Sequence, residues 1–157
     1  MAFVLKSSTI KQGQPIPIQH TGDGDNFSPE LSWTGTPAGT KEFALLCDDP
    51  DAPGKTFTHW TIYRIPHTTV NLKERILDLK NLPGSTMRQG LNDFGTVGYR
   101  GPRPPAGPSH RYYFKLYALS GSLDLEGAVP PHHVARALHG LVIAEAQLMG
   151  TYQRGGL

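Results

Sequence analysis

Two histidines and one acidic run are the side chains of this sequence best placed to do chemistry. The run is Asp48-Asp49-Pro50-Asp51, and His59 and His110 follow it along the chain. Carboxylates this close together raise each other's pKa values unless a partner compensates. An imidazole can donate to an anion, and a nearby carboxylate favours its protonated form. These residues leave two interpretations open: a solvated acidic turn with structural histidines, which is the commoner arrangement for such residues, and a site where protonated histidines bind an anion.

A proline-rich segment directly precedes His110. It spans Gly101–Gly107 (GPRPPAG) and leads into the sequence His110-Arg111-Tyr112. Because proline fixes φ and lacks an N–H donor, this segment predicts a stiff loop. Binding residues are often carried by such loops on a rigid scaffold. We expect the loop to contribute to the site, with a plain surface loop as the alternative. Arg100, Arg103 and Arg111 lie close in sequence, and either a surface patch or an ion pair between Arg111 and Asp51 would account for them.

Other kinds of site find less support in the sequence. His132, His133 and His139 lack the i, i+4 spacing of paired helical metal ligands, so we expect no metal. The sequence contains no G-x-S-x-G elbow and no P-loop, so we expect no cofactor and no catalytic residue. A hydrolase that uses Asp49 and His59 as an acid–base pair is the weaker alternative. Cys47, the one cysteine, falls in an apolar run and should be an inert core thiol.

Composition and charge narrow the class of protein. The chain has 157 residues, 38% of them hydrophobic and 18% charged, which fits one domain over residues 1–157. The net charge of +2 is too small to indicate a nucleic-acid partner. No apolar run is long enough for a membrane span, and the first residues do not resemble a signal peptide. With a single cysteine, these features predict a cytoplasmic protein.

Alternating apolar and polar residues predict the strands that position these groups. We expect strands over residues 3–10, 16–20, 31–33, 42–47, 57–65 and 110–119, the fourth of them buried on both faces. Near the end, Pro131 is a plausible helix start, and Val134, Leu138, Leu141, Leu148 and Tyr152 recur at helical spacing. The sequence thus predicts a mostly β fold with one long C-terminal helix.

Four motifs in order resemble the phosphatidylethanolamine-binding protein (PEBP) family, and in particular its bacterial and archaeal Raf kinase inhibitor-like branch. They are Ser28–Trp33, Asp49–Pro53, His59-Trp60, and Gly101–Gly107 with His110–Tyr112, and the resemblance runs from residue 3 to 154. It implies an antiparallel β-sandwich, a large sheet on a smaller one, with a C-terminal α-helix. It also implies a small anion pocket at one end of the large sheet, lined by Asp49, Ala52, Pro53, His59, Pro105, His110 and Tyr112.

The resemblance carries further expectations. The family binds phosphate-like groups, including phospholipid head groups of the phosphoethanolamine type. Some relatives inhibit a kinase or a serine protease by protein–protein contact, which is the alternative function. A homodimer and a cis peptide bond at Ala52–Pro53 are also implied. Arg103 stands where animal members carry glycine, and the stretch from Pro105 to His110 looks one residue shorter, so the pocket rim should differ from theirs.

Overall fold

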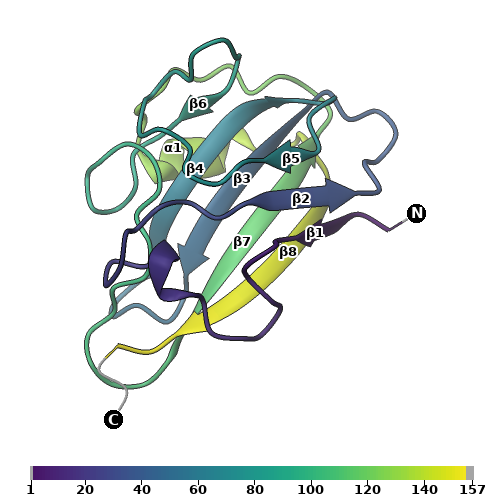
Figure 1. Ribbon diagram of the computed structural model, residues 1–157. Coiled ribbons are helices and arrows are strands. Elements are labelled where there is room, and N and C mark those ends of the chain that lie inside the picture. The colour runs from purple at the N-terminus through teal and green to yellow at the C-terminus, as the bar shows by residue number, and fades with distance from the viewer. Residues whose placement is uncertain (1, 155–157) are drawn as a thin grey trace.

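Two antiparallel β-sheets form the body of the protein in the computed structural model, which describes residues 2–154 (Figure 1). The five-stranded sheet has the order β6-β4-β3-β7-β8 and the three-stranded sheet the order β1-β2-β5. The large sheet comprises β3 (Glu42–Asp49), β4 (Phe57–Pro66), β6 (Arg88–Gln89), β7 (His110–Leu119) and β8 (Val142–Tyr152). The small sheet comprises β1 (Val4–Lys6), β2 (Leu31–Thr34) and β5 (Asn71–Leu72). The mostly β sandwich expected from the sequence is confirmed.

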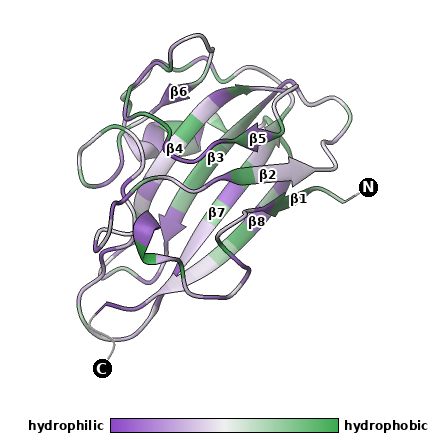
Figure 2. Ribbon diagram, in the orientation of Figure 1, coloured by the Kyte–Doolittle hydropathy of each residue, from purple (hydrophilic) through white to green (hydrophobic). Residues whose placement is uncertain are grey.

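The core occupies the space between the two sheets and continues on the other face of the large sheet. Trp33 and Leu5 of the small sheet pack in the same buried cluster as Phe43 and Phe114. On the opposite face, Leu46 belongs to a second cluster beneath α1 (Pro131–Ala137). Consecutive residues of β3 therefore enter different cores, and its middle is apolar without alternation (Figure 2). The prediction of a strand buried on both faces is confirmed.

The long C-terminal helix expected from the sequence is wrong in extent. α1 has seven residues, and after Leu138 the chain turns at Gly140, which has φ +80°. Residues 142–152 form β8 instead and pair with β7 from Leu119↔Val142 to His110↔Tyr152. Pairing satisfies the backbone groups along this side of β7, which a helix would leave open. No helix within residues 2–154 has the length and apolar character needed to cross a bilayer.

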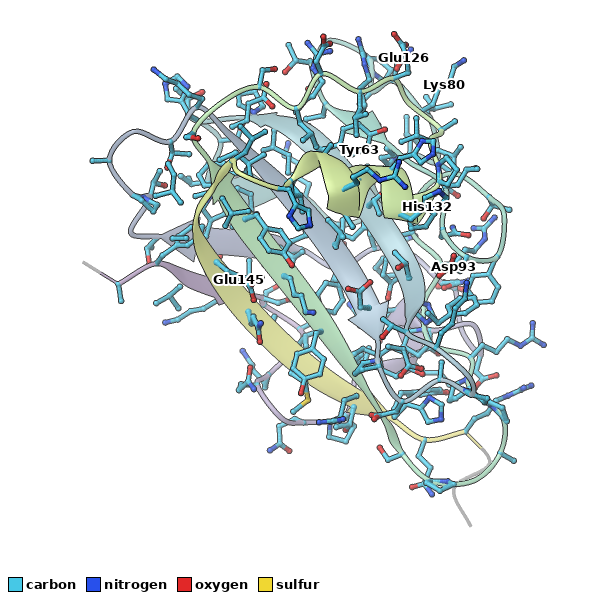
Figure 3. All side chains as sticks on the ribbon, turned by 180° about the vertical axis from the view of Figure 1, so that it is seen from behind. Tyr63, Lys80, Asp93, Glu126, His132 and Glu145 are labelled. Atoms are coloured by element: carbon cyan, nitrogen blue, oxygen red, sulfur yellow. The ribbon has the colours of Figure 1, made fainter. Side chains whose placement is uncertain are left out.

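Two more segments differ from expectation near the N-terminus. The strand expected over residues 3–10 is limited to β1, and residues 16–20 contain a 3₁₀ turn, η1 (Ile18–His20). Pro15 and Pro17 cannot donate to a strand ladder, which explains why this segment does not extend as a regular strand. On the far face, the Tyr63 hydroxyl donates to the carbonyl of Glu126, so the segment that leads into α1 is tied to β4 (Figure 3).

Candidate anion-binding site

A pocket of about 180 Å³ lies at the end of the large sheet where β3 ends and β4 and β7 begin. Antiparallel pairing places these three strand ends side by side, at the lower end of the sheet in Figure 1. The structure brings all seven residues expected in the pocket into its lining. The full lining comprises Asp49, Ala52, Pro53, Phe57, His59, Phe94, Arg103, Pro104, Pro105, His110 and Tyr112.

Asp49 and His110 form a buried pair in the pocket wall. The His110 Nδ1 lies 2.7 Å from Asp49 Oδ2, and both side chains are largely shielded from solvent. A carboxylate only accepts, so Nδ1 carries the proton and donates it. The second ring nitrogen, Nε2, is left for a ligand. Asp49 therefore accepts from the imidazole of His110, whereas the hydrolase alternative pairs it with His59.

His59 is held in a different state. Its Nδ1 donates to the carbonyl of Arg100 at 2.6 Å, and the residue is only 3% exposed. Burial lowers the His59 pKa, and the bond to Arg100 and the charge of Asp49 oppose that shift only in part. The neutral ring therefore presents Nε2 as an acceptor. The expectation that a carboxylate would hold both histidines protonated is wrong for His59, because desolvation outweighs the carboxylate.

The Tyr112 hydroxyl is the unpaired polar group of the site. Tyr112 is 1% exposed, and its hydroxyl oxygen is buried near the Asp49 carboxylate without a hydrogen bond of good geometry to any of residues 2–154. Burial, followed by the nearby Asp49 charge, raises the Tyr112 pKa well above its usual value, so the group stays a donor. An unpaired buried hydroxyl costs about 1–3 kcal/mol. A ligand oxygen in the pocket would remove that cost.

Each of the three carboxylates in the acidic run has its own hydrogen-bond partner. Arg111 contacts Asp51 through its backbone N, Nε and Nη2 at 2.8, 2.9 and 2.8 Å, which lowers the Asp51 pKa to about 2. Of the two alternatives for Arg111, the ion pair with Asp51 is the one that the structure contains. Asp48 lies outside the pocket lining, where it accepts from Thr58 at 3.0 Å, and burial raises its pKa.

The turn after β3 has only trans peptide bonds, as do all the described residues, so the predicted cis bond at Ala52–Pro53 is wrong. The bend is made by other means. Asp49 Oδ1 accepts from the backbone N of Asp51 at 2.8 Å, and Gly54 adopts φ +86°. A side-chain-closed turn followed by a left-handed glycine reverses the chain without a cis bond.

The proline-rich loop is fastened at its beginning. Gly101 N donates to Asn26 Oδ1 at 2.7 Å, and Gly22 N donates to the Pro102 carbonyl at 2.9 Å. A Cβ on Gly101 would lie 1.9 Å from the carbonyl oxygen of His20, so only glycine allows this close docking. The loop expected to contribute to the site is therefore positioned by the segment 20–26, far away in sequence.

Four lining residues were absent from the expected set. Phe57 lies two residues before His59, so the strand period could have placed both on one face. The Phe94 ring packs against both, with centroids 4.7 Å from Phe57 and 5.6 Å from His59. It comes from an irregular segment without any sequence signal. Arg103 and Pro104 adjoin the expected Pro105 on the same loop.

The other residues considered for chemistry, Cys47 and three histidines, lie outside the pocket. Cys47 is fully buried, and burial raises the pKa of its thiol, so the prediction of a core thiol is confirmed. His132, His133 and His139 are exposed on or beside α1. Within residues 2–154, no group of three or more histidine, cysteine or acidic side chains is arranged to hold a metal ion.

Comparison with known proteins matches the chain to one protein family and to solved structures of that fold. The family model described as phosphatidylethanolamine-binding protein matches residues 6–153. A UPF0098 protein of Methanothermobacter thermautotrophicus is 49% identical over 151 residues, covering 96% of this chain and 99% of that protein. The crystal structure of Escherichia coli YbcL, described as a new member of the mammalian PEBP family, superposes with a TM-score of 0.91 at 34% identity, covering 98% of this chain and 99% of that chain. A putative PEBP homologue from Chlamydia trachomatis gives 0.86 at 35% identity, covering 98% of each chain.

Proposed function

Because the chain belongs to the phosphatidylethanolamine-binding protein family, we propose that its pocket binds a small phosphate-like anion and does not catalyse a reaction. The observation that carries the proposal is the buried, unpaired Tyr112 hydroxyl in the pocket wall. A phosphate oxygen there would accept from Tyr112. His110, once protonated, would donate to a second oxygen through Nε2 while Asp49 balances the charge.

The neutral His59 fixes the expected pH dependence. Its Nε2 has no proton in the free protein at pH 7, so an anion bound beside it brings a proton or the site takes one up. Net proton uptake means that affinity rises as pH falls. Phosphoethanolamine and inorganic phosphate should therefore bind more tightly at pH 5.5 than at pH 8, measured by isothermal titration calorimetry in buffers of different ionisation heat.

Removal of His110 is the sharpest test of the proposal. His110→Ala should weaken phosphoethanolamine binding by at least about tenfold, the range expected for a hydrogen bond to a charged group. His139→Ala removes an exposed histidine outside the pocket and should change nothing. Binding that is flat from pH 5.5 to 8, or that survives loss of both pocket histidines, would contradict the proposal. Turnover of a phosphate ester that stops in His59→Ala would support the hydrolase instead.

Regulation of a kinase or a serine protease stays a prediction that rests on the resemblance alone. A full phospholipid is disfavoured as the ligand, since a pocket of about 180 Å³ suits a head group and not acyl chains. Competition between phosphoethanolamine and phosphatidylethanolamine vesicles would measure that difference.

A further inference from the structure

Arg103 is a pocket residue that the hydrogen bonds within the site leave unused. It is exposed and lines the pocket, and no carboxylate within residues 2–154 lies in ion-pair distance of it. The other exposed arginine of this end, Arg111, is engaged with Asp51. A free guanidinium at the mouth of a pocket offers several N–H donors to an incoming anion.

The position of Arg103 is set by its surroundings. Prolines precede and follow it, and the Pro102 carbonyl is fixed by Gly22 N at 2.9 Å. The aliphatic stem lies along Gly22, since a Cβ placed there would be 2.9 Å from Arg103 Cβ and 3.0 Å from its Cδ. A stiff backbone and a packed stem reduce the rotamer freedom that the side chain loses when it engages a ligand.

Arg103 also decides the charge of the pocket. Asp49 and a protonated His110 cancel each other, and burial keeps His59 neutral. Arg103 is the remaining charged residue of the lining and is permanently cationic. With it the pocket carries a net positive charge when His110 is protonated; without it the pocket would be neutral.

We propose that Arg103 makes this pocket select phosphate monoesters over phosphate diesters. The inference rests on the proposed function and names its ligand class. A monoester offers three terminal oxygens, which matches donors on Tyr112, His110 and Arg103, whereas a diester offers two. A monoester also carries about 1.5 to 2 negative charges at pH 7, against one on a diester, so it gains more from the added cation.

The test compares methyl phosphate with dimethyl phosphate, titrated into the full chain at pH 7 and low ionic strength. The wild-type protein should bind the monoester about tenfold more tightly. Arg103→Gln should weaken the monoester about fivefold and the diester less than twofold, because an exposed cation contributes modestly. Arg103→Lys should keep most of the selectivity. Arg136→Gln removes the same charge from the exposed face of α1 and should alter neither affinity.

The possible outcomes distinguish failure of the role inferred for Arg103 from failure of anion binding by the pocket. Equal affinity of the wild-type protein for both esters, or an equal loss for both in Arg103→Gln, overturns the role of Arg103 and leaves anion binding in place. Failure of the wild-type protein to bind either ester overturns both. A selective loss in Arg103→Gln together with an abolished signal in His110→Ala supports both.

Discussion

At the scale of single residues, Tyr112 separates stability from binding. Its hydroxyl lies near Asp49 but makes no hydrogen bond of good geometry to the described residues, so its removal costs the folded protein no well-formed hydrogen bond. Tyr112→Phe should raise the free energy of unfolding by about 1 kcal/mol, since an unsatisfied group is lost while the ring remains packed. The same change should weaken phosphoethanolamine binding. Urea unfolding and calorimetric titration of the one variant check both halves, and a destabilised Tyr112→Phe would mean that the hydroxyl is satisfied in solution.

Seven of the pocket residues were accessible from the sequence through the family resemblance, but their pairing was not. Asp49 and His110 are 61 positions apart, and they meet because β3 and β7 pair with Asp48 opposite Tyr113. Nothing in the local sequence indicates that the Arg100 carbonyl would take the His59 Nδ1 proton. Burial decides that His59 is neutral, and the bond to the Arg100 carbonyl, which favours the charged ring, opposes that shift only in part.

At the scale of elements, the docking of the proline-rich loop is the weak point of the site. Gly101→Ala would press a methyl group against the His20 carbonyl, at 1.9 Å from its oxygen. The loop must then move, which should lower the free energy of unfolding by about 1–3 kcal/mol and weaken anion binding together. Gly121→Ala is the matched control, because its Cβ would meet only the end of Leu141, at 3.3 Å. Thermal unfolding and titration of both variants test this; an unaffected Gly101→Ala would contradict the fixed-loop account.

Strand prediction succeeded where local pattern and tertiary partners agree. β7 has the predicted bounds of 110–119, since its alternation matches a sheet with one core face. The segment 142–152 carries two patterns at once: Leu148 and Tyr152 have helical spacing, but Ala146, Leu148 and Gly150 alternate and are its buried residues. The strand pattern wins because β7 offers a free edge for pairing. That edge lies in another part of the chain, so the segment's own sequence does not reveal it.

At the scale of the whole molecule, the homodimer implied by the resemblance stays a prediction. β8 ends the large sheet, and Val142 and Ile143 near its start are 44% and 40% exposed (Glu145 marks this strand in Figure 3). If copies pair here, Ile143→Lys should shift the protein from dimer to monomer without loss of anion binding. Multi-angle light scattering across a concentration series decides it, and a wild-type monomer at all concentrations would end the expectation.

Two buried histidines should make the fold acid-sensitive. His20 is fully buried, with Nε2 2.8 Å from Thr9 Oγ1 and Nδ1 2.9 Å from the Phe27 carbonyl, and burial lowers its pKa as it does that of His59. In the unfolded chain both titrate near 6.5, so below that pH the unfolded state binds protons that the folded state refuses. The free energy of unfolding should therefore fall as pH drops below about 6.5 until the lowered pKa values are passed, by about 1.4 kcal/mol for each unit of lowering.

Urea unfolding at pH 7 and pH 5 measures this loss directly. Replacing one buried histidine, in His20→Gln or His59→Gln, should flatten the dependence on pH, whatever the variant does to stability at pH 7. His67→Gln changes an exposed histidine and should leave the slope as it is. The raised pKa of Asp48 works in the opposite direction, because the folded state then takes up its proton more readily, so the measured slope is the difference between these effects. A wild-type protein that is no less stable at pH 5, or two variants that keep its slope, would show that the buried imidazoles do not control the acid response. The assignment of a neutral His59, on which the proposed proton uptake by the pocket depends, would then also be wrong.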